Sequence, residues 1–114
     1  MNLELTEEQL ALRDTVRRYL AEKASLAAYV RPLLDDGAGT GDEVWRGLAA
    51  LGVTGMLVPE ENGGAGMTMV EAGVVAEELG AALYPGPWSS SAVATTRALL
   101  HTGAGRNAAA LFAR

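Results

Sequence analysis

The sequence predicts an all-α fold of four to five helices with short connections and one long Gly/Pro-containing loop, and three observations support this prediction. Of the 56 residues that count as hydrophobic, 21 are Ala and 16 are Leu, and Ile is absent; this bias favours helices over strands. Apolar residues recur at helical spacing in several segments. These segments are bounded by capping residues, glycines or prolines.

The first helix begins after Thr6. Thr6 and Gln9 have the spacing of a capping box, in which the two side chains satisfy backbone N–H groups at the start of a helix. Apolar residues then recur at helical spacing as far as Leu20. Because a proline disfavours helical geometry in the residue before it, Pro32 predicts that this helix ends by Arg31.

Further helices follow, separated by turn-forming sequences. Residues 35–41 form a turn by composition, and the apolar stretch 53–58 is compatible with an extended segment. We expect a short helix from about Asp42 to a left-handed stop at Gly52, a third helix from a capping box at Thr68 to Gly80, a fourth from Ser89 or Ser90 to about His101, and a fifth from Asn107.

Composition excludes several classes of function. A chain of 114 residues is the length of a single domain. The absence of Cys and the presence of only one His, His101, argue against disulfides, zinc or iron–sulfur sites and thiol nucleophiles. A net charge of −5 argues against nucleic-acid binding. No apolar run approaches the ~20 residues of a membrane span, and no signal peptide is visible. We therefore expect a cytoplasmic protein.

Charge is distributed unevenly along the chain. Residues 1–62 carry six basic and eleven acidic residues, whereas residues 79–114 carry only Arg97, Arg106 and Arg114. A solvated surface carries a charge at about one position in four. We therefore expect the segment 79–114 to be covered by another part of a larger assembly.

The glycine-rich sequence 63–66 precedes a helix, and such sequences can bind phosphate through free backbone amides. A P-loop requires Lys and a hydroxyl residue after its last glycine, but Met67 and Thr68 follow here. A dinucleotide fingerprint requires a βαβ unit. A structural turn is the favoured interpretation, with an anion site as the alternative.

Acidic pairs and the single histidine give no catalytic site. Glu60-Glu61 and Glu77-Glu78 could perform acid–base work if a shared environment coupled them, but neighbours in sequence are more simply interpreted as solvated charge. The serines before His101 are too far along the same helix for a triad. We predict no catalytic residue and no metal ligand in this chain.

One stripe of the fourth helix has an unusual composition. Trp88, Ser91, Ala92 and Thr95 fall at i, i+3, i+4 and i+7, which is one face of an α-helix. Small side chains on that face would allow either a neighbouring helix or a narrow ligand to approach closely. Helix packing is the favoured interpretation, and ligand contact is the alternative.

The order of these motifs is distinctive. A capped first helix leads to Leu51-Gly52, then to Pro59-Glu60-Glu61-Asn62-Gly63-Gly64-Ala65-Gly66, then to a helix ending Glu77-Glu78-Leu79-Gly80, and finally to a helix rich in Ser and Ala. Over essentially the whole chain, this order resembles the N-terminal helical domain of the acyl-CoA dehydrogenase family. Asn62 is a departure, because members usually have an aromatic residue at that position.

The resemblance implies a fold and a chemistry. Family members are longer flavoenzymes that desaturate acyl-CoA thioesters: a glutamate removes the α-proton while the β-hydride passes to FAD. That glutamate and most FAD contacts lie in a middle β domain and a C-terminal helical domain, which we expect to be absent from this chain. The resemblance therefore assigns no catalytic or cofactor-binding residue here. It implies that Trp88, Ser91, Ala92 and Thr95 line the acyl pocket.

Two hypotheses follow. In the first, residues 1–114 are one domain of an acyl-CoA dehydrogenase, either truncated or split, which acts on acyl-CoA together with the remaining domains or a partner subunit in a homo- or hetero-oligomer. In the second, the chain is a non-catalytic interaction module or accessory subunit that binds a partner through residues 79–114. Neither hypothesis expects activity from the chain alone.

Overall fold

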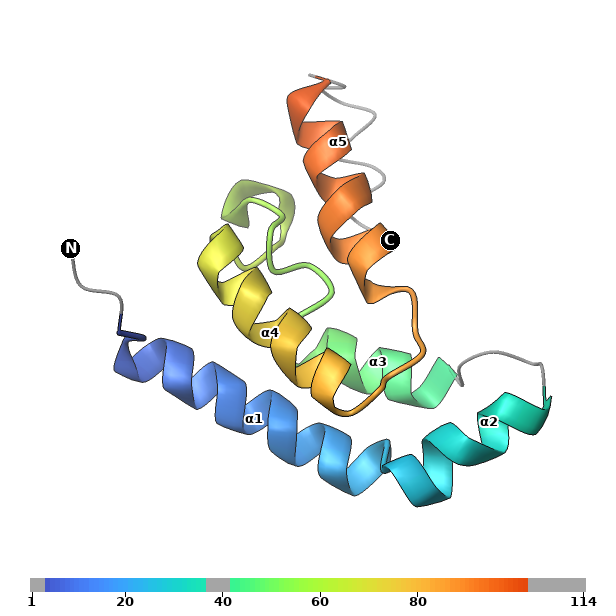
Figure 1. Cartoon of the computed structure of the whole chain (residues 1–114). Coiled ribbons are helices and arrows are strands. Elements are labelled where there is room, and N and C mark those ends of the chain that lie inside the picture. Colours follow the sequence, from blue (N-terminus) through green and yellow to red (C-terminus); the bar gives the residue numbers. More distant parts are fainter. Residues whose placement is uncertain (1–3, 37–41, 103–114) are drawn as a thin grey trace.

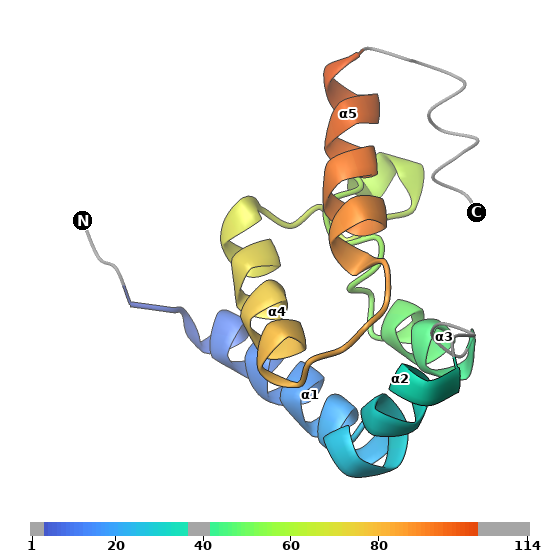
Figure 2. The same cartoon turned by 45° about the vertical axis from the view of Figure 1, so that its right-hand side comes forward.

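The computed structural model describes residues 4–36 and 42–102, and every regular element in these two ranges is a helix, which confirms the all-α prediction. The elements in order are α1 (Glu7–Lys23), the π-helix η1 (Leu26–Val30), α2 (Arg31–Asp36), α3 (Asp42–Ala50), the 3-10 helix η2 (Glu60–Asn62), α4 (Met69–Ala81), the π-helix η3 (Ser89–Thr95) and α5 (Thr96–His101). α4 lies along α1, and α5 points away from α1 (Figures 1 and 2). The helix expected from Asn107 lies outside the described residues.

The predicted capping box at the start of α1 is present. The Thr6 hydroxyl accepts a hydrogen bond from the Gln9 N–H at 3.2 Å, and Gln9 Oε1 accepts one from the Thr6 N–H at 2.9 Å. α1 ends at Lys23, because Ala24 leaves helical geometry.

The first helix ends before Arg31, as predicted, but Pro32 is not the reason, because a helix runs through it. Arg31 has α-helical backbone angles (φ −59°, ψ −45°) and begins α2, of which Pro32 is the second residue. A proline is tolerated in the first turn of a helix because the N–H that it lacks has no partner within that helix. Asp35 and Asp36, expected in a turn, are the last residues of α2.

The connection between α3 and α4 is compact and irregular. α3 is followed by the predicted left-handed Gly52, with φ +85°. Residues 53–58 form turns rather than a strand. The last residues before α4 bond back to this stretch: the Gly66 N–H donates to Val58 O at 2.9 Å, and the Met67 N–H donates to Met56 O at 2.7 Å. The stretch is apolar because the connection folds back over the core.

α4 begins at the predicted cap and ends later than expected. The Thr68 hydroxyl accepts from the Val70 N–H at 3.2 Å and donates to the Glu71 carboxylate, a bond that lowers the pKa of Glu71. Instead of stopping at Gly80, α4 continues to Ala81, and the left-handed residue beyond it is Leu83, with φ +53°.

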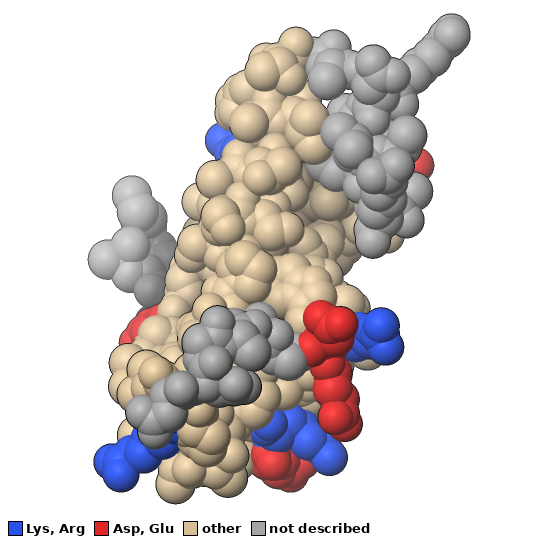
Figure 3. Space-filling view, turned by 90° about the vertical axis from the view of Figure 1, so that its right-hand side faces the viewer, with Lys and Arg blue, Asp and Glu red and all other residues tan. Residues whose placement is uncertain are grey.

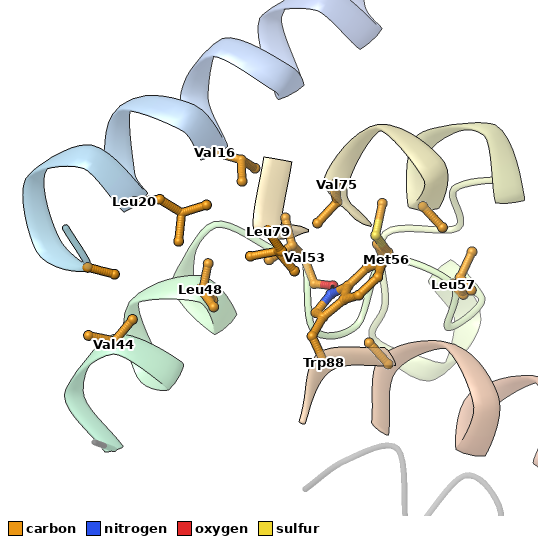
Figure 4. Close-up of a cluster of buried hydrophobic side chains, with 13 residues drawn as sticks. Val16, Leu20, Val44, Leu48, Val53, Met56, Leu57, Val75, Leu79 and Trp88 are labelled. Atoms are coloured by element: carbon orange, nitrogen blue, oxygen red, sulfur yellow. Dashed lines mark hydrogen bonds between the residues drawn. The ribbon is translucent and has the colours of Figure 1, made fainter. Parts of the chain in front are cut away.

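A single cluster of buried side chains joins these elements (Figure 4). α1, α3 and α4 all contribute to it, and the connection between α3 and α4 contributes as much as a helix does. The fully buried large side chains are Leu20, Leu48, Met56, Val16, Val53 and Val75. Trp88 lies at the junction with η3, and its indole N–H donates to Val53 O at 2.9 Å.

An ion pair links α1 to α4. Arg17 Nε donates to Glu78 Oε2 at 3.0 Å, and a second guanidinium nitrogen donates to Glu78 Oε1 at 2.7 Å. Glu78 is buried, with 6% of its surface exposed, so its interpretation as solvated charge was wrong, whereas Glu77 is exposed as predicted. The hydrogen bond from Arg17 holds the pKa of the Glu78 carboxyl below its ordinary value.

Tyr19 holds α3 against α1. Its hydroxyl donates to Val44 O at 3.0 Å, and its ring lies directly over Gly47. A β-carbon built on Gly47 would lie 1.8 Å from the Tyr19 hydroxyl oxygen. Only glycine therefore leaves room for this contact.

The ion pair predicts an asymmetric response to mutation. Arg17→Met should lower the free energy of unfolding more than Glu78→Gln, because it leaves a buried carboxylate without its cation, whereas Glu78→Gln leaves an exposed guanidinium that water can solvate. Since the Glu78 pKa is depressed, its contribution is complete above the ordinary value of 4.5 and is lost as the pH falls through the lowered value. Urea unfolding of wild type and Glu78→Gln at several pH values should show their difference shrinking in acid. Glu77→Gln, at the exposed neighbouring position, is the control. If it lowered the free energy of unfolding as much as Glu78→Gln, the pairing of Arg17 with Glu78 would be contradicted.

Substitution by alanine at two glycines within helices should have opposite effects on stability. Gly47→Ala should destabilise the chain by about 1–3 kcal/mol, since it displaces Tyr19 from a packed position. Gly73→Ala, where a β-carbon meets nothing within 4 Å, should stabilise it by up to about 1 kcal/mol through helix propensity. Thermal or urea unfolding of both variants provides the measurement, and stabilisation by Gly47→Ala would show that Tyr19 does not cover Gly47 in solution.

Candidate functional site

The candidate site is the helix that follows the break at residues 85–87. Its first part, η3, is π-helical, a geometry defined by backbone bonds to the carbonyl five residues earlier instead of four. At its start the Ser91 N–H still donates to Pro87 O, four residues earlier, at 3.1 Å. Two threonine hydroxyls follow the same five-residue spacing. Thr95 Oγ1 donates to Ser90 O at 2.7 Å, and Thr96 Oγ1 donates to Ser91 O at 3.4 Å. π-helical geometry is rare, and its common form, a single-turn bulge within an α-helix, is frequently found at functional sites.

The π-helix separates the four residues that were expected on one stripe. Trp88 and Ala92 are buried, with 3% and 1% of their surfaces exposed, whereas Ser91 and Thr95 are exposed. The buried side repeats every four residues and continues to Thr96, which is 5% exposed. An α-helical stripe would have kept Ser91 and Thr95 beside Trp88. The structure therefore brings Trp88 and Ala92 together in the core and turns Ser91 and Thr95 outward.

Trp88 also lines a surface hollow. A space of about 370 Å³ at the end of α4 and the start of η3 is lined by Leu79, Tyr84, Trp88 and Ser89, among others. Leu79 and Trp88 also belong to the hydrophobic core, so the hollow adjoins the core at these two side chains.

The glycine-rich sequence 63–66 forms a closed turn. The Gly63 N–H donates to Glu60 O, the Gly64 N–H to Pro59 O and the Gly66 N–H to Val58 O, at 2.9–3.1 Å. These amides are therefore already bonded and do not form a cradle for phosphate. The structural interpretation of the sequence is confirmed.

The remaining candidates give no reactive group. Glu60, Glu61 and His101 are exposed. In the two described ranges, no group of three or more His, Cys, Asp or Glu side chains could hold a metal ion. Among the described residues, no helix is long and apolar enough to cross a membrane.

The surface around α5 carries almost no charge. From residue 79 to residue 102 the only Lys, Arg, Asp or Glu is Arg97. Figure 3 shows a face on which uncharged residues extend over the part formed by α5, whereas most of the charged ones gather at the opposite end of the molecule. Exposed leucines lie at both ends of this segment: Leu83 is 60% exposed and Leu100 is 39% exposed.

Two features of this site were missing from the predictions. Thr96 was not singled out, although it lies four residues after Ala92 and eight after Trp88, a spacing that places all three near one side of a helix. Glu78 was assigned to solvent although it falls four residues after Val74 on the apolar side of α4, and that periodicity could have identified its burial.

Comparisons with known proteins agree on one family. The model of the acyl-CoA dehydrogenase N-terminal domain matches residues 6–107. Acyl-CoA dehydrogenase IpdE2 of Mycobacterium tuberculosis is 40% identical over 82 residues, which are 71% of this chain and 26% of that protein. IpdE2 of Mycolicibacterium smegmatis is 39% identical over 100 residues, 87% of this chain and 32% of that protein.

A third relative is longer still. Acyl-CoA dehydrogenase FadE34 of Mycobacterium tuberculosis is 39% identical over 98 residues, which are 80% of this chain and 14% of that protein. The match therefore spans between about a seventh and a third of the length of these relatives. No solved structure matches the chain.

The indole of Trp88 predicts a measurable stability effect. Trp88→Phe should lower the free energy of unfolding by about 2–3 kcal/mol, because it leaves the buried Val53 carbonyl without its donor and the core with a smaller ring. Trp45→Phe, at a half-buried position on the edge of the same cluster, should cost less than about 1 kcal/mol. Urea unfolding followed by circular dichroism compares the two, and equal losses would contradict the anchoring role of Trp88.

Proposed function

Because the chain belongs to the acyl-CoA dehydrogenase family and corresponds to its N-terminal domain, we propose that it is the N-terminal helical domain of an FAD-dependent enzyme that desaturates acyl-CoA thioesters between the α- and β-carbons. The observation that carries the proposal is the family match over residues 6–107. The names of the similar proteins, acyl-CoA dehydrogenases in each case reported above, support the same activity.

The role proposed for this chain is one wall of the acyl pocket. Ser91 and Thr95 are small, exposed side chains on a helix whose opposite side is held in the core by Trp88 and Ala92. A rigid helix that presents small side chains allows an acyl chain to approach its backbone closely, and binding pockets of this kind are largely pre-formed. In this role Trp88 and Ala92 position the wall, and Ser91 and Thr95 face the substrate.

The chemistry is proposed to lie elsewhere in the enzyme. The glycine-rich turn does not fit a pyrophosphate site, because the N–H groups of Gly63, Gly64 and Gly66 are bonded within the chain. The FAD site and the proton-abstracting glutamate would lie in the part of the enzyme that corresponds to the additional length of the relatives. The nearly uncharged surface around α5 is suited to packing against that part, in the same chain or in a partner subunit.

The pocket wall can be tested in the complete enzyme that contains this domain. Ser91→Leu and Thr95→Leu should lower kcat/KM for long acyl-CoA thioesters about tenfold or more, since a methylene-scale conflict in a pocket costs ~1–3 kcal/mol. Ala49→Leu, at an exposed position of α3 outside η3, is the control and should leave kcat/KM nearly unchanged. Dye-linked oxidation with thioesters of increasing chain length gives the rates, and the flavin content of each variant shows that the fold is intact.

Two outcomes would contradict the proposal. Equal effects of all three leucine variants would remove the pocket-wall role of Ser91 and Thr95. Flavin binding and acyl-CoA oxidation by residues 1–114 alone would show that the chemistry does not need another part of the enzyme.

A further inference from the structure

The π-helical geometry of η3 decides which way its small polar side chains face. In an α-helix, positions i, i+3, i+4 and i+7 share a face, so Trp88, Ser91, Ala92 and Thr95 would all lie on the buried side. In the structure the hydrogen-bonded turn contains one more residue, and the buried side follows Trp88, Ala92 and Thr96 instead. The two geometries differ in whether Ser91 and Thr95 are buried or exposed.

The threonine hydroxyls favour the π-helical geometry. In an α-helix a threonine hydroxyl bonds back to the carbonyl three or four residues earlier. Here Thr95 and Thr96 both donate to the carbonyl five residues earlier, at 2.7 Å and 3.4 Å. Because Thr96 is 5% exposed, its hydroxyl needs a protein partner, and the π-helical turn provides Ser91 O. Both acceptors, Ser90 O and Ser91 O, belong to η3, the segment in which the α-helical and π-helical geometries differ.

We propose that Thr95 and Thr96 are positioning residues whose hydroxyls hold residues 89–95 in the π-helical register and thereby keep Ser91 and Thr95 on the exposed side of the helix. The register itself is a property of this chain. Its consequence for substrate selection rests on the proposed function, because there the exposed side is the wall of the acyl pocket.

The register can be measured in the chain alone. Couplings across hydrogen bonds between amide nitrogens and carbonyl carbons, observed by NMR, identify the acceptor of each N–H in η3. After Ser91, which bonds to Pro87 O four residues earlier, wild type should show acceptors five residues earlier. The double variant Thr95→Val/Thr96→Val, which keeps the side-chain shape and removes both hydroxyls, should show acceptors four residues earlier throughout. Thr95→Ser/Thr96→Ser, which keeps the hydroxyls, should restore the wild-type pattern.

Matched controls separate the hydroxyls from general loss of stability. Thr102→Val removes a hydroxyl that donates to Leu99 O, only three residues earlier, and should leave the η3 couplings unchanged. Thr95→Val alone changes an exposed residue, so it reports on the register even if the double variant unfolds. Five-residue couplings that persist in both valine variants would overturn the proposal.

The complete enzyme then distinguishes this inference from the proposed function. If both are correct, Thr96→Val, which leaves the substrate-facing Thr95 unchanged and is measured in the same NMR experiment, changes the ratio of kcat/KM between long and short acyl thioesters about tenfold at unchanged flavin content, and Thr102→Val does not. A register that shifts in the NMR experiment while this ratio stays constant supports the positioning role of the hydroxyls and contradicts the pocket wall.

Discussion

The burial of Trp88 against Val53 is the constraint on which the position of the last helix depends. A buried indole must give its N–H to an acceptor, and here the acceptor is a backbone carbonyl 35 residues earlier, in the connection between α3 and α4. That connection has no regular secondary structure at this point, so its place is determined by its own buried side chains and by the bonds that close it at Met67. The helix carrying Ser91 and Thr95 is thus attached to the core mainly at its start, where Trp88 is the largest of its buried side chains.

α1 is held to α4 and to α3 by two contacts of different physical kinds. Toward α4, Arg17 compensates the burial of the Glu78 carboxylate, so the contact depends on charge and weakens when that carboxylate is protonated. Toward α3, Tyr19 lies over Gly47 and bonds to Val44 O, so that contact depends on the absence of a side chain. Together these two contacts hold α3 and α4 against α1, and Trp88 packs on the cluster that the three helices form.

Under the proposed function, this arrangement would let the domain contribute to an enzyme through the surface of one helix. The core side of η3 is occupied by Trp88, Ala92 and Thr96, and the outer side carries small polar residues and hardly any charge. A helix of this kind can form a boundary between a packed interior and a ligand or a neighbouring domain. The selectivity of such a boundary for a ligand would then depend on the number of residues in the hydrogen-bonded turn of η3, because that number determines which side chains face outward.

Local features of this protein were determined by the sequence alone, because they depend on residues a few positions apart. The caps at Thr6 and Thr68, the left-handed Gly52 and the closed turn at residues 63–66 are of this kind. Only the tertiary structure decided that Arg17 meets Glu78, since they are 61 positions apart and the periodicity that marks Glu78 as buried does not identify its partner. The same holds for η3: the sequence indicated a helix with small residues on one side, but packing around Trp88 and the two threonine hydroxyls decided its register, and the register decided which side faces out.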